Sequence, residues 1–264
     1  MSTMVKSAPS TSSRATLTGR LSAAIKALQV AVGLKKKSWR ELNRGQYKSV
    51  WNSISTSEED AKRVVAGLTD EDIIRQSVSL TLAMLQRYVG LARDDVVLEI
   101  GAGVGRVGAA VAPLCREWIG TDVSENMVRH MQRRLAALRN VRVIATNGCD
   151  LAAIPSGSVD LVYCTVVFPH LDEWDRYGYI AEGFRVLKPG GRMLVDNVNL
   201  VSDAGWQMFL QHCAIPPAER PPNISMTSTP QELETYFRRA GYRDVAQADG
   251  GHMIIVYGRK PLSE

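Results

Sequence analysis

A carboxylate and three glycines stand at fixed spacing around the end of a short apolar run. The run Val96–Ile100 contains Glu99 and is followed by Gly101, Gly103 and Gly105. Glycine allows a tight turn and a close approach to the backbone, so the pattern predicts a nucleotide-like ligand against this turn. A carboxylate here would repel a pyrophosphate and would suit a ligand that carries an ammonium group or hydroxyls. The alternative is a strand end that needs glycine only for its own turn.

A dinucleotide would require glycines at another spacing. When the pattern G-x-G-x-x-G is counted from Gly101, Arg106 occupies the third glycine position. Gly103, Gly105 and Gly108 satisfy the pattern two residues late, and a single match of this kind is weakly specific. An NAD(P)-dependent oxidoreductase is therefore the rival enzyme class rather than the favoured one.

Asp122 and His170 follow two later apolar runs and could each do chemistry. An ionised carboxylate only accepts hydrogen bonds, so Asp122 could receive two hydroxyl groups at once. Alternatively, Asp122 is an acid favoured near the start of a helix. An imidazole titrates close to neutral pH, so His170 is the first candidate for a general base, and His212 is a weaker one. The alternative for His170 is a loop histidine bonded to the backbone.

These residues require a scaffold in which short strands alternate with helices. Five short apolar runs are separated by segments with helical spacing, at residues 96–100, 118–121, 141–145, 161–165 and 193–195. This alternation predicts an α/β fold with a mostly parallel sheet and helices on both faces.

The C-terminal part carries its own start and stop signals. Thr229 and Pro230 predict the beginning of a helix that ends at Gly241. Two strands are expected after it, at 243–247 and 253–259, joined as an antiparallel hairpin.

The N-terminal part differs from the remainder. Residues 1–40 contain eight basic and no acidic side chains, and apolar residues recur at helical spacing from Leu17 to Val32. We expect a partly disordered arm with an amphipathic helix, which could dock on the main domain, contact a membrane surface or a long-chain substrate, or belong to an organellar transit peptide. Residues 41–92 are predicted to form a helical extension.

The main domain is expected over residues 93–264. It includes a long irregular insert at about 198–228, rich in proline and aromatic residues. Inserts of this kind often cover a site, so we expect it to cap an acceptor pocket together with the N-terminal helices and Trp51.

Composition restricts the classes of function. The chain has 264 residues, of which 45% are hydrophobic, enough for a full core, and it has no apolar run that could span a membrane. The net charge of +5 comes from the arm, because the remainder carries 24 basic against 27 acidic side chains. A nucleic-acid-binding face is therefore not expected. Four cysteines without paired spacing, and no secretory segment, predict a cytoplasmic protein with reduced thiols.

Taken in order, the motifs resemble those of the class I S-adenosylmethionine-dependent methyltransferases over about residues 96–195. The segment 99–105 is similar to the family's first motif, and Asp122 to its acid that binds both ribose hydroxyls. The loop 147–151 resembles the adenine loop, and 185–192 resembles the turn before the fifth strand. The resemblance implies a Rossmann-like sheet of seven strands and S-adenosylmethionine as the cofactor.

The resemblance also implies roles for single residues. The glycines wrap the amino-acid part of the cofactor, with Glu99 near its amino end. Many relatives have Asp where Asn147 stands, so the adenine partner could be Asn147 or Asp150, and Cys149 could pack on the ring. The implied cofactor-binding residues are Glu99, Gly101, Ala102, Gly103, Gly105, Asp122, Val123, Asn147, Gly148, Cys149, Asp150, Cys164 and Thr165.

A catalytic metal is not favoured. Asp196 and Asn197 resemble a pair that helps to bind Mg²⁺ in catechol-type relatives. Those relatives also need an acid at the end of the fourth strand, where Cys164 and Thr165 are poor ligands for a hard cation.

We therefore expect an enzyme that moves a methyl group to a hydroxyl or carboxyl of a small metabolite, lipid or sugar by in-line displacement. One rival is an RNA or protein methyltransferase that uses the basic arm, which the acidic balance of residues 41–264 argues against. Residues 167–170 also differ from the Asn-Pro-Pro-Tyr signature of nitrogen-methylating families. Another rival is a binding module that only senses the cofactor. The sequence predicts no oligomeric state.

Overall fold

The computed structural model describes residues 42–66 and 71–262. The arm predicted for residues 1–40, with its amphipathic helix, lies outside the described residues.

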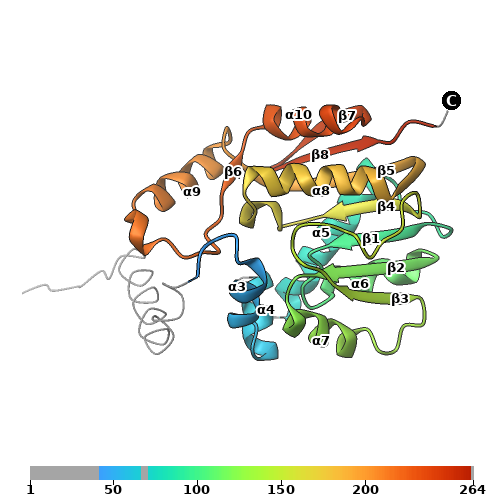
Figure 1. Ribbon diagram of the computed structural model, residues 1–264, viewed down its shortest axis with the longest axis horizontal. Helices are drawn as coiled ribbons and strands as arrows, with labels where there is room; N and C mark the ends of the chain where they lie inside the picture. Colours follow the sequence, from blue (N-terminus) through green and yellow to red (C-terminus); the bar gives the residue numbers. More distant parts are fainter. Residues whose placement is uncertain (1–41, 67–70, 263–264) are drawn as a thin grey trace, which may run out of the picture. The chain divides into compact units, whose positions relative to one another are not determined.

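The described part is built on one mixed sheet (Figure 1) with the strand order β3-β2-β1-β4-β5-β8-β7. The first five strands of this order run parallel, β8 is antiparallel to β5, and β7 is antiparallel to β8. The bounds are β1 Val96–Ile100, β2 Glu117–Asp122, β3 Val141–Ala145, β4 Val159–Cys164, β5 Leu187–Asn199, β7 Arg243–Gly250 and β8 Met253–Arg259. The Rossmann-like sheet with an antiparallel C-terminal hairpin is thus confirmed.

The predicted count of seven strands is one too low for the described residues. An eighth strand, β6 (Thr227–Ser228), pairs in parallel with the end of β5. A strand of two residues carries no alternating pattern, which is why sequence periodicity could not indicate it.

Helices cover both faces of the sheet. Figure 1 shows α8 on one side and α5 and α6 on the other. On the α8 side, Leu98 of β1 packs in one core cluster with Ile180, and on the opposite side Val97 packs in another with Leu85. The helix bounds are α3 Tyr47–Ser53, α4 Glu58–Ala66, α5 Glu71–Tyr88, α6 Arg106–Val111, α7 Glu125–Arg134, α8 Glu173–Val186, α9 Asp203–Cys213 and α10 Pro230–Ala240.

The helix predicted from Thr229 begins and ends where expected. The Thr229 hydroxyl accepts a hydrogen bond from the backbone N–H of Glu232 at 3.2 Å, and Gly241 ends α10 with φ 104°. α3 lies in the helical extension predicted for residues 41–92, but its own bounds were not predicted, because only Tyr47 and Val50 of its seven residues are buried. Two buried positions give too little periodicity to indicate a helix.

The indole of Trp118 fills space that two glycines leave open. A Cβ atom added at Gly120 would lie 2.1 Å from Cη2 of Trp118, and one added at Gly108 would lie 2.3 Å from Cζ2. Trp118 is fully buried on β2. The glycine at position 120 is therefore required by packing rather than by backbone conformation.

Replacing Gly120 by alanine is expected to lower the free energy of unfolding by about 3 kcal/mol, because the new methyl group overpacks the core. The matched control is Gly178→Ala in α8, where an added Cβ atom would lie 3.9 Å from the Cys149 carbonyl oxygen, an ordinary contact distance. This control should raise the free energy of unfolding by about 0.5 kcal/mol, because glycine is a weak helix former. Urea unfolding of both variants would measure the difference, and equal stabilities would contradict the packing argument.

The insert after β5 is partly regular. It holds α9, a single 3₁₀ turn at Pro217–Glu219, and β6. No helix among the described residues is both long enough and apolar enough to cross a bilayer.

Candidate functional site

A cleft opens at the carboxyl ends of β1, β2 and β4. Its walls in the described part come from the turn after β1, the ends of β2 and β4, the 3₁₀ turn η2 (Phe168–His170), and helices α3, α4 and α5. It contains about 1130 Å³ of space not filled by protein atoms, part of it open to solvent. This is the edge of a parallel sheet at which ligands of such folds bind.

The turn after β1 has the backbone conformation that the glycine pattern predicts. Gly101, Gly103 and Gly105 have φ values of 69°, 56° and 74°, in the left-handed region that favours glycine. Gly101, Ala102 and Gly103 line the cleft. Gly105 does not line it and instead approaches the side chain of Met131, where an added Cβ would be 2.8 Å from Cγ.

Asp122 joins this turn to the start of α7. Its Oδ2 accepts the Gly103 N–H at 2.9 Å and its Oδ1 accepts the Ser124 N–H at 2.8 Å. Ser124 caps α7 by accepting the Met127 N–H at 3.2 Å. Asp122 therefore both lines the cleft and fixes the turn, which combines the two interpretations of the sequence.

Burial makes the Asp122 carboxylate costly to ionise. Desolvation raises its pKa to about 6, and the backbone N–H groups of Ser124, Gly103 and Val123 act against this rise. A carboxylate with spare acceptor capacity is thus available to hydroxyl groups at neutral pH.

Glu99 lies at the bottom of the cleft and is held by a chain of side chains. Trp118 donates its indole N–H to the Tyr163 hydroxyl at 3.0 Å, and that hydroxyl donates to Oε2 of Glu99. The three residues come from β2, β4 and β1, which are neighbours in the sheet. Burial raises the pKa of Glu99 to about 8, although the bond from Tyr163 and the charge of Arg106 both lower it.

Arg106 lines the same part of the cleft and was missed as a site residue. Its guanidinium donates to the Ser77 hydroxyl at 3.1 Å and to the Val65 carbonyl at 2.9 Å. The position of Arg106 could have indicated that it lies in the cleft, because it directly follows the glycine turn and is the first residue of α6.

The adenine loop predicted at 147–151 reaches the cleft through Gly148, and Val123 lines the cleft nearby. Asn147, Cys149 and Asp150 are not among the lining residues of the described part. The Asn147 amide instead closes its own turn, since it accepts the Cys149 N–H at 2.9 Å and donates to Asp150 Oδ2 at 2.8 Å. The adenine contacts of these three residues stay predictions.

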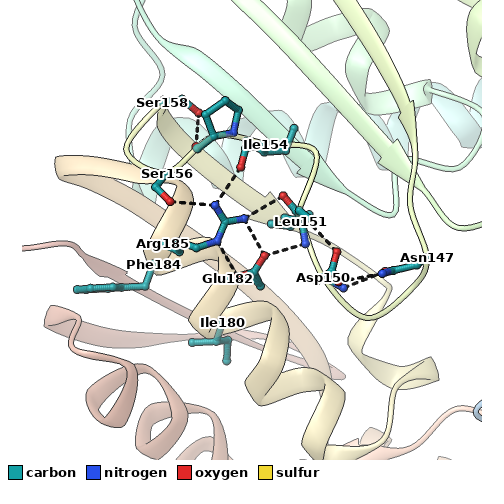
Figure 2. A network of polar contacts seen from close by, with 12 residues as sticks. Asn147, Asp150, Leu151, Ile154, Ser156, Ser158, Ile180, Glu182, Phe184 and Arg185 are labelled. Carbon is teal, nitrogen blue, oxygen red and sulfur yellow. Dashed lines mark hydrogen bonds and ion pairs between the residues drawn. The ribbon is translucent and has the colours of Figure 1, made fainter.

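The same loop is fixed to α8 (Figure 2). Arg185 donates to the carbonyl oxygens of Leu151 at 2.9 Å and of Ile154 at 3.0 Å. Glu182 accepts the Leu151 N–H at 2.8 Å and pairs with Arg185 at 2.7 Å. Two side chains of one helix therefore set the position of the loop that carries Gly148.

At the end of β4, Thr165 lines the cleft and Cys164 does not. Cys164 is fully buried, and desolvation raises its pKa far above the ordinary value of a thiol. A cofactor contact of Cys164 stays a prediction, whereas Thr165 has the placement that its predicted role requires.

His170 lines the cleft, which its predicted role requires. Its Nδ1 is 2.9 Å from the Asn223 carbonyl oxygen, which can only accept, so Nδ1 donates and Nε2 keeps its lone pair. Burial lowers the His170 pKa to about 4, and the charge of Arg44 adds to this effect. The imidazole is therefore neutral at physiological pH.

The aromatic wall beside His170 comes from α3. Trp51 packs edge-on against the imidazole with ring centroids 4.9 Å apart, and Tyr47 also lines the cleft. The Tyr47 hydroxyl donates to Asp175 Oδ2 at 2.6 Å and accepts the Asp172 N–H at 3.1 Å. These bonds attach α3 to the beginning of α8.

The insert does not line this cleft in the described part. It touches His170 through the Asn223 carbonyl oxygen, and it lines a second cavity that includes His212 and residues 42–44. A cap formed by the insert stays a prediction, whereas Trp51 and the helices α3, α4 and α5 do line the cleft.

Asp196 and Asn197 are both engaged in bonds to the protein. Asp196 Oδ1 accepts the Val166 N–H at 2.6 Å, and the Asn197 amide donates to the Ser228 hydroxyl at 2.6 Å. Within the described residues, no three His, Cys, Asp or Glu side chains converge as a metal site would require. The expectation that the site works without a metal stays a prediction.

Comparisons with known proteins agree with this geometry. A family model described as "Methyltransferase domain" matches residues 97–191. A protein of Mycolicibacterium smegmatis named "Probable S-adenosylmethionine-dependent methyltransferase" is 34% identical over 142 residues, 53% of this chain and 51% of that protein. A demethylmenaquinone methyltransferase of Tropheryma whipplei is 32% identical over 109 residues, 41% of this chain and 44% of that protein. The chain thus spans about half the length of these curated relatives, or less.

Among solved structures, an S-adenosylmethionine-dependent methyltransferase from Thermotoga maritima superposes with a TM-score of 0.59. It is 18% identical and the match covers 81% of this chain and 99% of that one. At this identity the likeness concerns the fold.

Proposed function

Because this chain belongs to the class I S-adenosylmethionine-dependent methyltransferases, we propose that it transfers a methyl group from S-adenosylmethionine to a small-molecule acceptor. The observation that carries the proposal is the cleft itself. Its lining includes Glu99, two glycines of the turn and Asp122, together with the neutral imidazole of His170 and the rings of Tyr47 and Trp51.

The residues present fit the cofactor. Gly101 and Gly103 line the cleft with left-handed backbone, and they are glycines in close contact with Val167 and Val65, with which an added Cβ atom would clash. Glu99 is a buried acid in the cleft, which suits an ammonium group, and Asp122 can accept hydroxyl donors beside it. When bound, S-adenosylmethionine supplies a methyl carbon activated by its positive sulfur.

The chain's own contribution is to bind, orient and exclude water. The glycine turn and Asp122 would hold the nucleoside, Val166 and Leu171 add apolar lining to the cleft, and Val167 packs on Gly101. An apolar lining excludes water from the site of methyl transfer. Correct orientation of the acceptor toward the methyl carbon then accelerates the displacement. His170 Nε2 is positioned to take a proton from an acceptor hydroxyl.

We infer that the acceptor is a largely apolar molecule with an acidic hydroxyl or a carboxyl group. The low pKa of His170, about 4, makes it a weak base, so it would suit an acceptor that gives up its proton easily, such as a phenol. The aromatic rings of Trp51 and Tyr47 offer faces and edges for an unsaturated ring. The name of the Tropheryma whipplei relative, a demethylmenaquinone methyltransferase, likewise indicates a small molecule for that protein.

Calorimetry with S-adenosylhomocysteine and with NAD tests the cofactor assignment. The wild-type protein should bind the first and not the second. Asp122→Ala should weaken binding roughly tenfold or more, because a bond to a charged group contributes about 1.5–3 kcal/mol. The control Asp249→Asn changes an exposed acid of the C-terminal hairpin and should leave the affinity unchanged. Binding of NAD in preference to S-adenosylhomocysteine would overturn the proposal.

A further inference from the structure

Val166 has a backbone conformation that valine rarely adopts. Its φ of 60° is left-handed, and the only other described residue of a type other than glycine with positive φ is Asp244. For a β-branched residue this conformation costs on the order of 1–3 kcal/mol. The Val166 side chain is 53% exposed, so its own packing does not compensate for this cost. Another interaction must therefore hold Val166 in place.

Asp196 is the residue that provides this interaction. Its Oδ1 accepts the Val166 N–H at 2.6 Å, and no other hydrogen bond to its carboxylate is found among the described residues. β4 and β5 are paired up to Cys164 and Val195, so Asp196 lies next to the point where the chain leaves β4. Asp196 is buried and does not line the cleft. A buried acid without a cationic partner is costly, and its single bond goes to the strained residue.

The turn at Val166 also determines where the next residues lie. Val167 packs directly on Gly101, because a Cβ atom added there would be 2.4 Å from Cγ2 of Val167. The Val167 carbonyl oxygen accepts the His170 N–H at 2.9 Å. The conformation of Val166 thus sets both the surface beside the glycine turn and the start of the 3₁₀ turn that carries the imidazole.

We propose that Asp196 is a positioning residue that holds Val166 left-handed and thereby seats Val167 against the glycine turn of the cofactor site. The effect of Asp196 on cofactor affinity rests on the proposed function, whereas its effect on the conformation of residues 165–171 does not. The bond needs an acceptor oxygen rather than a negative charge, so an amide at this position should serve nearly as well. A glycine at position 166 should make the bond dispensable, because glycine adopts the conformation without strain.

The experiment measures two properties of Asp196→Ala, Asp196→Asn, Val166→Gly and the double variant Asp196→Ala/Val166→Gly. The first is amide hydrogen exchange of residues 165–171, which needs no cofactor. The second is the dissociation constant of S-adenosylhomocysteine. Asp196→Ala should speed exchange and weaken binding about tenfold, while Asp196→Asn stays within about twofold of wild type. The double variant should recover binding to within about threefold of wild type.

The matched control is Asp196→Ala/Asp244→Gly. Asp244 has a φ of 52° at the irregular pairing of β7, so glycine relieves the same kind of strain far along the chain from the cleft residues. This variant should remain as weak in binding as Asp196→Ala. The proposal is overturned if Asp196→Ala leaves exchange unchanged, if Asp196→Asn is as impaired as Asp196→Ala, or if Asp244→Gly rescues as well as Val166→Gly. Loop protection that depends on Asp196 in a protein that does not bind S-adenosylhomocysteine would support the positioning role and refute the cofactor assignment.

Discussion

The affinity of the wild-type protein for S-adenosylhomocysteine is expected to rise roughly tenfold per pH unit between about pH 6.5 and pH 7.5. Burial raises the pKa of Glu99 to about 8, so the ligand-free carboxyl is mostly protonated at neutral pH. A ligand with an ammonium group favours the carboxylate, and binding must then release the proton. Calorimetry in buffers of different ionisation enthalpy would count the released protons.

Glu99→Gln is the matched variant, because glutamine keeps the shape and does not titrate. Its affinity should be lower at about pH 7.5 and should change little with pH in this range. The ligand's own amino group is that of a free amino acid, stays protonated over this range and affects both proteins equally. The other titratable groups that act on Glu99 are Tyr163, Arg106, Asp122 and Cys164. Equal pH dependence in the two proteins would exclude Glu99 as the linked group.

As the pH rises, Glu99 lowers the free energy of unfolding, although it strengthens ligand binding. The pKa of its carboxyl is higher in the folded than in the unfolded state, so between these two values the folded protein binds more protons than the unfolded protein. The ligand-free protein should therefore lose stability as the pH rises from about 4.5 to about 8, as far as Glu99 contributes.

Tyr163→Phe removes a bond that lowers the Glu99 pKa, so it should move the rise in affinity to higher pH. Tyr242→Phe, which loses a bond to the Ile180 carbonyl at 3.2 Å, is the buried control.

Replacing His170 by alanine is expected to reduce turnover roughly 100-fold or more, while the affinity for S-adenosylhomocysteine stays within about twofold. The reason is that Nε2 carries the free lone pair beside the acceptor wall, and the glycine turn does not depend on it. Methyl transfer to a panel of phenols and carboxylic acids would be followed with a labelled methyl group.

The pH profile separates this role from that of an ordinary histidine. With a pKa of about 4, the imidazole stays neutral well below pH 6.5, so protonation of His170 should not reduce the rate between about pH 8 and pH 6. His212→Ala is the matched control, since its Nδ1 also contacts a carbonyl oxygen, that of Ser225 at 2.9 Å, but it lines the second cavity. Equal losses for both variants would refute the base assignment.

β1, β3 and β8 have the bounds that their apolar runs predicted. Only β1 of the three is buried throughout, so the apolar residue types carried the signal rather than uniform burial. β5 was predicted at 193–195 and spans Leu187–Asn199. Asp196, Asn197 and Asn199 interrupt the apolar pattern although they are buried. Their polar groups bond to neighbouring loops, and such tertiary partners cannot be seen in a single strand's sequence.

The residues around the glycine turn could be predicted from local spacing, and among the other lining residues the sequence indicated Trp51 and His170 but not Tyr47. Glu99, the glycine turn and Asp122 lie within single strand ends, so their placement follows from the sheet. Tyr47 reaches the cleft through bonds to Asp172 and Asp175, more than a hundred residues further along the chain. No periodicity in residues 41–56 indicates that contact.

The attachment of α3 to α8 has a consequence for how members of such families diverge. The segment matched by the family model, 97–191, contains the glycine turn, Asp122 and Gly148, which line the cleft. Tyr47 and Trp51, which line the same cleft, lie before that segment. Exchange of the helices before β1 between relatives would therefore change which acceptor is methylated and keep the residues that bind the methyl donor. Chimaeras joined near the start of β1 would be the natural place to look for new selectivity.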